Sequence, residues 1–308
     1  WKAKRILWNT FNFGAVNTTN NNQFKLEVGG YNVIEGKSYG EIGAEARTMH
    51  KSQGEGRPRR RGSSLEFFET TGGEAPTKDL MDGIDIGWSR LGASAIQEQV
   101  ATIIQQFKIE NPSAVVPALV KLYGQVNALP NSIWKNYELA QIQSLIKDAS
   151  GIYMEASTQK AQVIPGETIS VQVLINQRSS VNTQLVKLQL PSKDSLMQKT
   201  LSNNQNTNID YSFKVQTNTA ISQPYWLVQP KTEGMFLVND YAFIGKAEND
   251  PAFSVTAQMN IEGVDFSFIQ PIQYKYTDPT KGDVYQPLAV IPAKETKYDK
   301  EVYLMRSN

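Results

Sequence analysis

The chain contains a single histidine, His50, and the residues beside it are of types that build polar pockets. Arg47, Lys51, Ser52 and Gln53 lie next to it in the sequence. Imidazole is the side chain best suited to exchange protons or bind a metal near neutral pH. These five residues are therefore a candidate rim of an active site. The alternative is structural, because a histidine at the C-terminal end of a helix interacts favourably with the helix dipole.

A second group of candidates lies in the loop that follows, which reads RPRRRG over residues 57–62. Pro58 excludes a helix there. Arginine binds carboxylates and phosphates through paired hydrogen bonds, so Arg57, Arg59 and Arg60, with Arg61 beside them, are candidate anion ligands. A solvated basic loop is the alternative interpretation.

Two further groups of residues are of types that could bind or hydrolyse sugars. Asp82 and Asp85, with Glu74 and Asp79 nearby, could supply the two carboxylates of a glycosidase. Tyr225 and Trp226 are adjacent large aromatic residues and are candidates for sugar stacking. The alternative for the aromatic pair is packing against the core of a β-sandwich or its junction with helices.

Several kinds of chemistry have no residues to perform them. A hydrolytic zinc site needs several His, Asp or Glu ligands around an open position. With one histidine and no HExxH or HxxH motif, we assign no metal ligand and no complete set of catalytic residues. Cysteine is absent, which excludes thiol catalysis and disulfide bonds.

Bulk composition narrows the choice of partners. The 31 basic and 30 acidic residues give a net charge of +1, so we expect no nucleic-acid partner. No apolar run approaches the ~20 residues of a membrane span. Abundant Asn, Gln, Ser and Thr favour an exported protein, periplasmic or on the cell surface.

The elements that position the candidates follow from periodicity. Residues 4–13 have the bulky, β-prone composition of a buried strand, and Gly29-Gly30 predicts a short hairpin. Ser38 followed by Glu41 is the spacing of a capping box and predicts a helix start. Apolar stripes with breaks at Pro112 and Pro130 predict three helices over residues 94–150. Beyond residue 151 the period changes to two, and a hairpin is predicted at Glu262-Gly263.

Together these patterns predict a multidomain α+β protein. The predicted parts are an N-terminal domain over residues 1–91, a helical segment over 92–152 and an immunoglobulin-like antiparallel β-sandwich over 153–283. Residues 284–308 are predicted to be a linker or the start of a further module, with a strand over residues 297–305. Because the first strand begins so soon after Trp1, we expect this chain to be a piece of a longer protein.

The stretch GKSYGEIGAEARTMHKSQGEG, followed by RGSSLEFFE and DLMDGIDIGWSRL, resembles the C-terminal part of bacterial LmbE-like proteins. These belong to the PIG-L (N-acetylglucosaminyl-phosphatidylinositol) de-N-acetylase superfamily. Ala46, His50, Ser52 and Gln53 match the family's Ala-x-x-x-His-x-Ser-Gln pattern. Longer exported members also resemble PGETISVQVLINQRS, ISQPYWLV and DPTKGDVYQPLAVIP, so the similarity extends along nearly the whole chain.

The resemblance implies the tail of a Rossmann-like α/β domain in which zinc serves to remove the N-acetyl group of an amino sugar. The family's zinc ligands come from His-Pro-Asp-Asp and His-x-x-His motifs, and neither is present in this sequence. We therefore expect the chain to be the C-terminal portion of a hydrolase, inactive alone and without a cofactor of its own. Its partner would be the N-terminal part of the same polypeptide. The alternative is a noncatalytic carbohydrate-binding or scaffold module that contacts a glycan.

Overall fold

The computed structural model describes residues 3–294 and 296. The chain has a mixed α+β fold and divides into two compact units, unit 1 (Trp1–Ala93) and unit 2 (Ser94–Asn308), which are described separately. The strand predicted over residues 297–305 lies outside the described residues. No helix in the described part of the chain is both long enough and apolar enough to cross a membrane.

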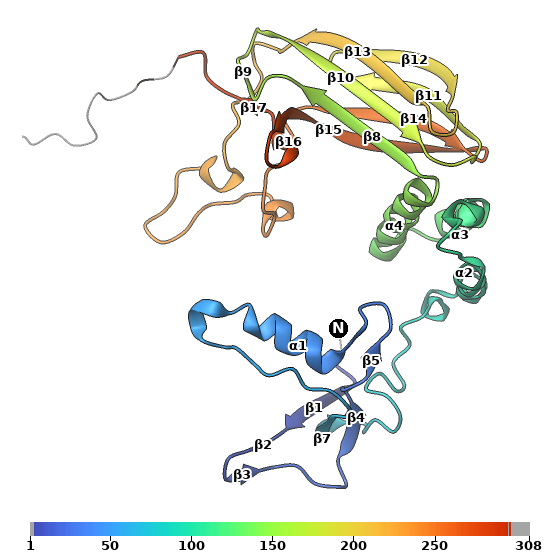
Figure 1. Cartoon of the computed structure of the whole chain (residues 1–308), viewed down its shortest axis with the longest axis vertical. Coiled ribbons are helices and arrows are strands. Elements are labelled where there is room, and N and C mark those ends of the chain that lie inside the picture. The colour runs from blue at the N-terminus through green and yellow to red at the C-terminus, as the bar shows by residue number, and fades with distance from the viewer. Residues whose placement is uncertain (1–2, 295, 297–308) are drawn as a thin grey trace, which may run out of the picture. The chain divides into compact units, whose positions relative to one another are not determined.

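Unit 1 is built on a small antiparallel sheet in the order β1-β7-β4, which Figure 1 shows beside a single α-helix. Two short ribbons and two 3₁₀ turns complete the unit. The elements are β1 (Arg5–Thr10), β2 (Asn12–Phe13), β3 (Val16–Asn17), β4 (Phe24–Glu27), β5 (Tyr31–Asn32), β6 (Lys37–Ser38), α1 (Tyr39–Thr48), η1 (Lys51–Gln53), β7 (Leu65–Gly73) and η2 (Trp88–Leu91).

The capping box predicted for α1 is confirmed. Ser38 Oγ accepts a hydrogen bond from the Glu41 amide at 3.2 Å, and Glu41 Oε2 accepts one from the Ser38 amide at 3.0 Å. Gly54 closes the turn that follows, at φ +65°. The hairpin predicted at Gly29-Gly30 is wrong, because β4 pairs with β7 and β5 pairs with β6.

Unit 1 has almost no apolar core. Apart from Pro76, the only apolar side chains buried within residues 3–93 are the methyl groups of Ala44 and Ala93. Residues 4–13, predicted to be a buried strand, leave Ile6 62% and Trp8 43% exposed. The composition was that of a core strand, but no described element of unit 1 covers this face of the sheet.

Unit 2 begins with three helices, as the periodicity predicted: α2 (Ser94–Gln106), α3 (Val116–Asn127) and α4 (Ile133–Ala149), with the 3₁₀ turn η3 (Pro112–Val115) before α3. The apolar stripe predicted for the first helix is only partly buried. Its members are Ile96, Val100, Ile103, Ile104 and Phe107; Ile96 and Ile103 are buried, whereas Ile104 and Phe107, the residue after α2, are exposed.

A strongly curled mixed sheet follows, in the order β12-β11-β14-β15-β8-β10-β13, with β16 also paired to β15 (Figure 1). The strand β15 is 15 residues long and is shared by the two halves of this sheet. Its first part pairs with β14, and its second part pairs with β8 and β16. The strands are β8 (Ile152–Thr158), β10 (Thr168–Gln177), β11 (Thr183–Leu190), β12 (Lys193–Thr200), β13 (Asn206–Lys214), β14 (Ser254–Ile261), β15 (Val264–Asp278) and β16 (Gly282–Pro287).

The alternation predicted for these strands places one side chain in two inside the curl. Val173, Ile175, Leu185 and Met259 are each fully buried there. Each such side chain contributes roughly 1.5–3 kcal/mol of transfer free energy. The hairpin predicted at Glu262-Gly263 joins β14 to β15, and both of its turn residues have positive φ. Unit 2 therefore has the core that unit 1 lacks.

The helices cover the beginning of β15. Gln143 of α4 donates a hydrogen bond to the Ser267 carbonyl at 2.6 Å, and Tyr123 of α3 packs edge-to-face on Phe266 with ring centroids 5.0 Å apart.

Two segments differ from a simple sandwich followed by a linker. Residues 284–287, predicted to be a linker, belong to β16 and pair with β15. Beyond them, β17 (Ala289–Val290) pairs in parallel with β9 (Gln162–Val163). A long irregular segment over residues 215–253 connects β13 to β14 and contains the turns η4 (Tyr225–Leu227) and η5 (Tyr241–Phe243).

Candidate functional site

The residues predicted to form a rim around His50 lie on the surface of unit 1. His50 precedes η1, and its Nδ1 lies 3.0 Å from Gln53 Oε1. Arg47 forms an ion pair with Glu55 at 2.9 Å. Lys51 and Ser52 are exposed. None of the five residues lines the cavity beside Phe24 in unit 1 or the cavity beside Tyr225 in unit 2.

The arginine loop (residues 57–62) is fastened to α1 by two ion pairs. Arg59 lies 3.2 Å from Glu45, and Arg61 lies 2.7 Å from Glu41. Arg57 lies 3.0 Å from Glu55, which precedes the loop and also pairs with Arg47 of α1. The hydrogen bond from Lys37 holds the pKa of Glu45 below its usual value, and the one from Arg47 does the same for Glu55. These pairs occupy three of the four guanidinium groups that could otherwise receive an external anion.

Arg60 contributes through its backbone. Its carbonyl accepts a hydrogen bond from Ser38 Oγ at 3.0 Å, directly beside the start of α1. A Cβ atom on Gly40 would lie 2.7 Å from the same carbonyl, so the loop approaches the helix at a position where glycine is required. The role of Arg57, Arg59 and Arg60 as anion ligands remains a prediction.

The paired carboxylates are committed to local turns. Asp82 Oδ2 accepts hydrogen bonds from the Lys78 amide at 2.6 Å and from the Thr77 amide at 2.8 Å. These bonds hold the pKa of Asp82 far below its usual range. The pKa of Asp85 is likewise lowered, first by the Gly87 amide. A glycosidase acid needs a raised pKa, so neither carboxyl group is suited to donate a proton.

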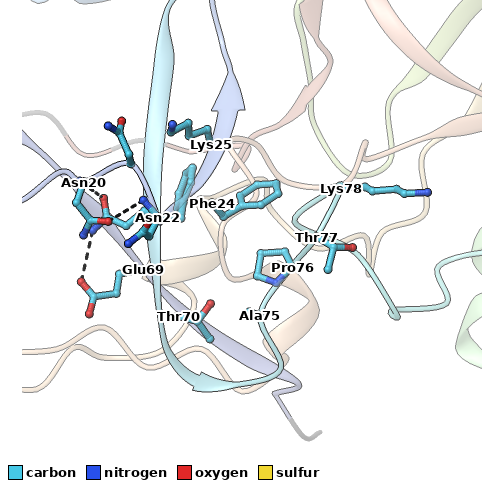
Figure 2. Close-up of a pocket in the computed structure, with 13 residues that line it drawn as sticks. Asn20, Asn22, Phe24, Lys25, Glu69, Thr70, Ala75, Pro76, Thr77 and Lys78 are labelled. Atoms are coloured by element: carbon cyan, nitrogen blue, oxygen red, sulfur yellow. Dashed lines mark hydrogen bonds between the residues drawn. The ribbon is translucent and has the colours of Figure 1, made fainter.

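Unit 1 contains a cavity of about 650 Å³ that the sequence did not predict. Phe24 and Phe68, which are direct cross-strand partners, lie in its wall together with Pro76. In Figure 2 the rings of Phe24 and Pro76 lie between the Asn20–Asn22 turn on one side and Thr77 and Lys78 on the other. The cavity therefore combines apolar rings with a polar rim.

Hydrogen bonds fix both rims of this cavity. On one rim, Gln23 Oε1 accepts from the Asn20 amide at 2.9 Å and from Thr10 Oγ1 at 3.0 Å. Asn20 Oδ1 in turn accepts from the Asn22 amide at 2.9 Å. On the other rim, the bonds to Asp82 hold Thr77 and Lys78. The cavity is thus largely pre-formed, as small-molecule sites usually are.

The polar groups at the rim are of several kinds. Asn21, Asn22 and Thr70 are among the lining residues and carry amides and a hydroxyl, whereas the side chain of Lys78, another lining residue, extends away from Phe24 in Figure 2. Such groups hydrogen-bond to hydroxyls and carbonyls, while the rings accept an apolar face. Sequence patterns missed the site because its residues come from three separate segments. The only local signal was the asparagine run, which alone indicates no more than a polar loop.

The aromatic pair of unit 2 lies in the irregular segment rather than on the sheet. Tyr225 stacks on Phe243 with ring centroids 5.6 Å apart, and Trp226 meets Tyr225 edge-to-face at 4.9 Å. The Tyr225 hydroxyl donates to the Lys246 carbonyl at 3.1 Å. Tyr225 and Phe243 line a cavity of about 320 Å³, whereas Trp226 does not. Both Tyr225 and Trp226 are half-buried.

Sequence reasoning also missed a buried carboxylate on the curled sheet. Glu155 of β8 accepts hydrogen bonds from the hydroxyls of Tyr285 at 2.6 Å and Tyr153 at 2.8 Å, and from Lys275 at 3.1 Å. Burial raises the pKa of Glu155, but these bonds outweigh it and keep that pKa below its ordinary value. Lys275 also pairs with Asp283 at 3.0 Å, so the cluster fastens β16 to β8 and β15.

The described residues contain no group of three or more His, Asp or Glu side chains placed to hold a metal ion.

Comparisons with known proteins give no family. No family model matches the chain, and no curated protein matches it. Among solved structures, one match is Spo0M, the sporulation control protein of Bacillus subtilis, with a TM-score of 0.22 and 12% identity over 40% of this chain and 49% of that one. Another is the Pseudomonas fluorescens alkylpurine DNA glycosylase AlkC, bound to DNA containing an abasic site analog. Its TM-score is 0.19, with 10% identity over 60% of this chain and 52% of that one. The chain thus covers about half of each, and TM-scores this low support no inference about fold or function.

Proposed function

We propose that this chain is the C-terminal portion of a zinc-dependent de-N-acetylase that acts on an N-acetylated amino sugar or glycoconjugate. Unit 1 would be the tail of its Rossmann-like catalytic domain, and unit 2 its helical segment and immunoglobulin-like β-sandwich. The composition favours an exported protein. The resemblance of residues 36–56 to LmbE-like proteins motivates the proposal, and one structural observation supports it.

That observation is the missing core of unit 1. Its sheet carries large apolar side chains on both faces. Trp8 of β1 and Phe67 of β7 lie on one face, and Leu7 of β1 and Phe68 of β7 lie on the other. Apolar residues on both faces are typical of a sheet covered by helices on either side. None of these four side chains is buried. A unit of about 90 residues with so little burial cannot offset its conformational entropy alone, so we infer that another part of the polypeptide covers the sheet.

The large cavity of unit 1 would then form one side of the sugar site. The rings of Phe24 and Phe68 would pack on the apolar face of a pyranose, and Asn22 would bond its hydroxyls. The described residues do not form a zinc site, so we assign no catalytic step to the metal here. Zinc and its ligands would come from the N-terminal part of the polypeptide.

Deacetylation and zinc content test this proposal. We expect the chain alone to release no acetate from N-acetylglucosamine conjugates, and the intact polypeptide to release it with one tightly held zinc. In the intact polypeptide, Asn22→Ala should raise KM and leave kcat nearly unchanged, whereas Asn208→Ala, on β13 of unit 2, should change neither. Stoichiometric, tightly bound zinc in this chain alone would contradict the proposal, as would an intact polypeptide that releases no acetate.

A second candidate function is noncatalytic glycan binding by unit 2. The supporting observation is the cavity of about 320 Å³ beside Tyr225 and Phe243, where aromatic rings lie next to Asn239 and Asp240. Titration of the full chain with cell-wall glycans tests it. We expect Asn239→Ala, which removes a lining group, to weaken binding, and Trp226→Ala, which alters a ring outside the cavity, to have a smaller effect. Equal affinity for all three proteins would contradict a glycan site at this cavity.

A further inference from the structure

Five side-chain oxygens in unit 2 are buried without a hydrogen-bond partner among the described residues, and three of them belong to residues that are almost completely inaccessible. These three are Ser150 Oγ, Gln177 Oε1 and Thr183 Oγ1, on residues that are 0%, 1% and 0% exposed. Ser150 follows α4, Gln177 ends β10, and Thr183 begins β11. Leaving a buried polar group unpaired costs about as much as losing a hydrogen bond, so three such oxygens on almost inaccessible residues need an explanation.

Hydrogen bonds place the three residues around one junction. Gln177 Nε2 donates to the carbonyls of Val181 at 2.5 Å and Ser179 at 3.3 Å. Ser179 Oγ donates to the Ser150 carbonyl at 2.7 Å, which connects the end of α4 to the same turn.

A second set of bonds brings Thr183 to the same place. The Leu201 amide donates to the Thr183 carbonyl at 2.9 Å, and the Asn204 amide donates to the Gln177 carbonyl at 2.6 Å. The short segment that follows β12 therefore touches both residues.

The strand alternation gives the direction of two of these side chains. Gln177 lies on the same side of β10 as Ile175, and Thr183 on the same side of β11 as Leu185. Ile175 and Leu185 are fully buried inside the curl, so the amide of Gln177 and the hydroxyl of Thr183 also face the interior. Both lie at the end of the sheet where α4 gives way to β8.

We propose that these three oxygens bind a buried water molecule that joins the C-terminal end of α4 to the curled sheet. A water can donate to Gln177 Oε1 and still bond both hydroxyls, and buried waters typically make about three such bonds. None of the three groups is charged, and an ion buried without a counter-charge would cost far more than a water. The water is thus a structural ligand at the joint between the helices and the sheet.

A crystal structure of the full chain, at a resolution that shows ordered water, tests the site directly. We expect a water within hydrogen-bond distance of at least two of the three oxygens. If instead the oxygens bond directly to one another or to other protein groups, and no water lies between them, the proposal is wrong.

Urea unfolding of the full chain, with near-isosteric variants in unit 2, supplies a second test. Thr183→Val and Ser150→Ala should each lower the folding equilibrium constant about five- to thirtyfold, because each leaves a water bond unmade. The folding equilibrium constant of the double variant should fall by less than the product of the two single fold-decreases, because both changes act on one water. Thr256→Val, a partly exposed control on β14, should have little effect. An unchanged or raised folding constant in Thr183→Val would overturn the proposal.

Discussion

Phe24 of β4 and Phe68 of β7 are direct cross-strand partners, and neither ring is buried within unit 1. In an independent domain such a pair would lie at the centre of a core, as Val173 does in unit 2. Here the two rings line an open cavity instead. The two units therefore differ in how much apolar surface they bury.

The first prediction concerns local stability. Amides of β1, β4 and β7 should exchange with solvent much faster than those of β10 and β14, because unit 1 buries so little apolar surface. Replacing Ile175 with Ala in unit 2 should lower the free energy of unfolding by about 2–5 kcal/mol. Trp8→Ala in unit 1 should cost less than about 1 kcal/mol, because Trp8 is already 43% exposed. Hydrogen exchange and urea unfolding measure both effects, and equal protection of the two sheets would contradict the account.

The second prediction uses two glycines of α1 as a matched pair. Gly40→Ala should displace the arginine loop, since its Cβ would lie 2.7 Å from the Arg60 carbonyl. Gly43 has open space around it, so Gly43→Ala should stabilise the helix by up to about 1 kcal/mol. Hydrogen exchange of residues 39–48 measures both, and similar effects of the two substitutions would show that the loop does not approach α1.

The third prediction is a dependence of unit 1 on pH. The pKa values of Glu41, Glu45 and Glu55 are held below the ordinary 4.5, mainly by Ser38, Lys37 and Arg47 respectively. A lowered folded-state pKa stabilises the folded state above pH 4.5, and this contribution is lost as pH falls through the lowered values. Protection of α1 should therefore decline below about pH 4.5, and the decline should be weaker in Glu45→Gln. A profile that is flat between pH 6 and pH 3 would contradict these pairings.

The fourth prediction concerns the buried cluster at Glu155. Lys275→Met leaves the carboxylate buried without its counter-charge and should cost about 3 kcal/mol at pH 7. Tyr285→Phe removes one neutral hydrogen bond and should cost about 1 kcal/mol. The pKa of Glu155 should rise in Lys275→Met. The difference in free energy of unfolding between that variant and the original protein should therefore shrink on acidification. Urea unfolding at several pH values measures this, and a constant difference would mean that Glu155 is not an uncompensated charge.

The sequence predicted the parts of the fold that depend on local patterns. The capping box at Ser38 and Glu41, the helices of residues 94–150 and the hairpin at Glu262-Gly263 are all confirmed. Each is set by residues within a few positions of one another, so periodicity and turn chemistry are sufficient to find it.

What the sequence could not give depends on contacts between distant segments. The composition of residues 4–13 indicated burial, but burial requires a covering layer, and no described element of unit 1 supplies one. The cavity beside Phe24 and the cluster around Glu155 are assembled by strand register from separate segments. The strand β15 changes partners along its length, which alternation alone does not reveal.

If unit 1 is the tail of a larger catalytic domain, as we propose, the coding sequence upstream of Trp1 should encode the rest of that domain. We expect a His-Pro-Asp-Asp motif there, followed by a His-x-x-His motif, in the same reading frame. An upstream sequence that lacks both motifs, or a start codon directly before Trp1, would contradict the proposal.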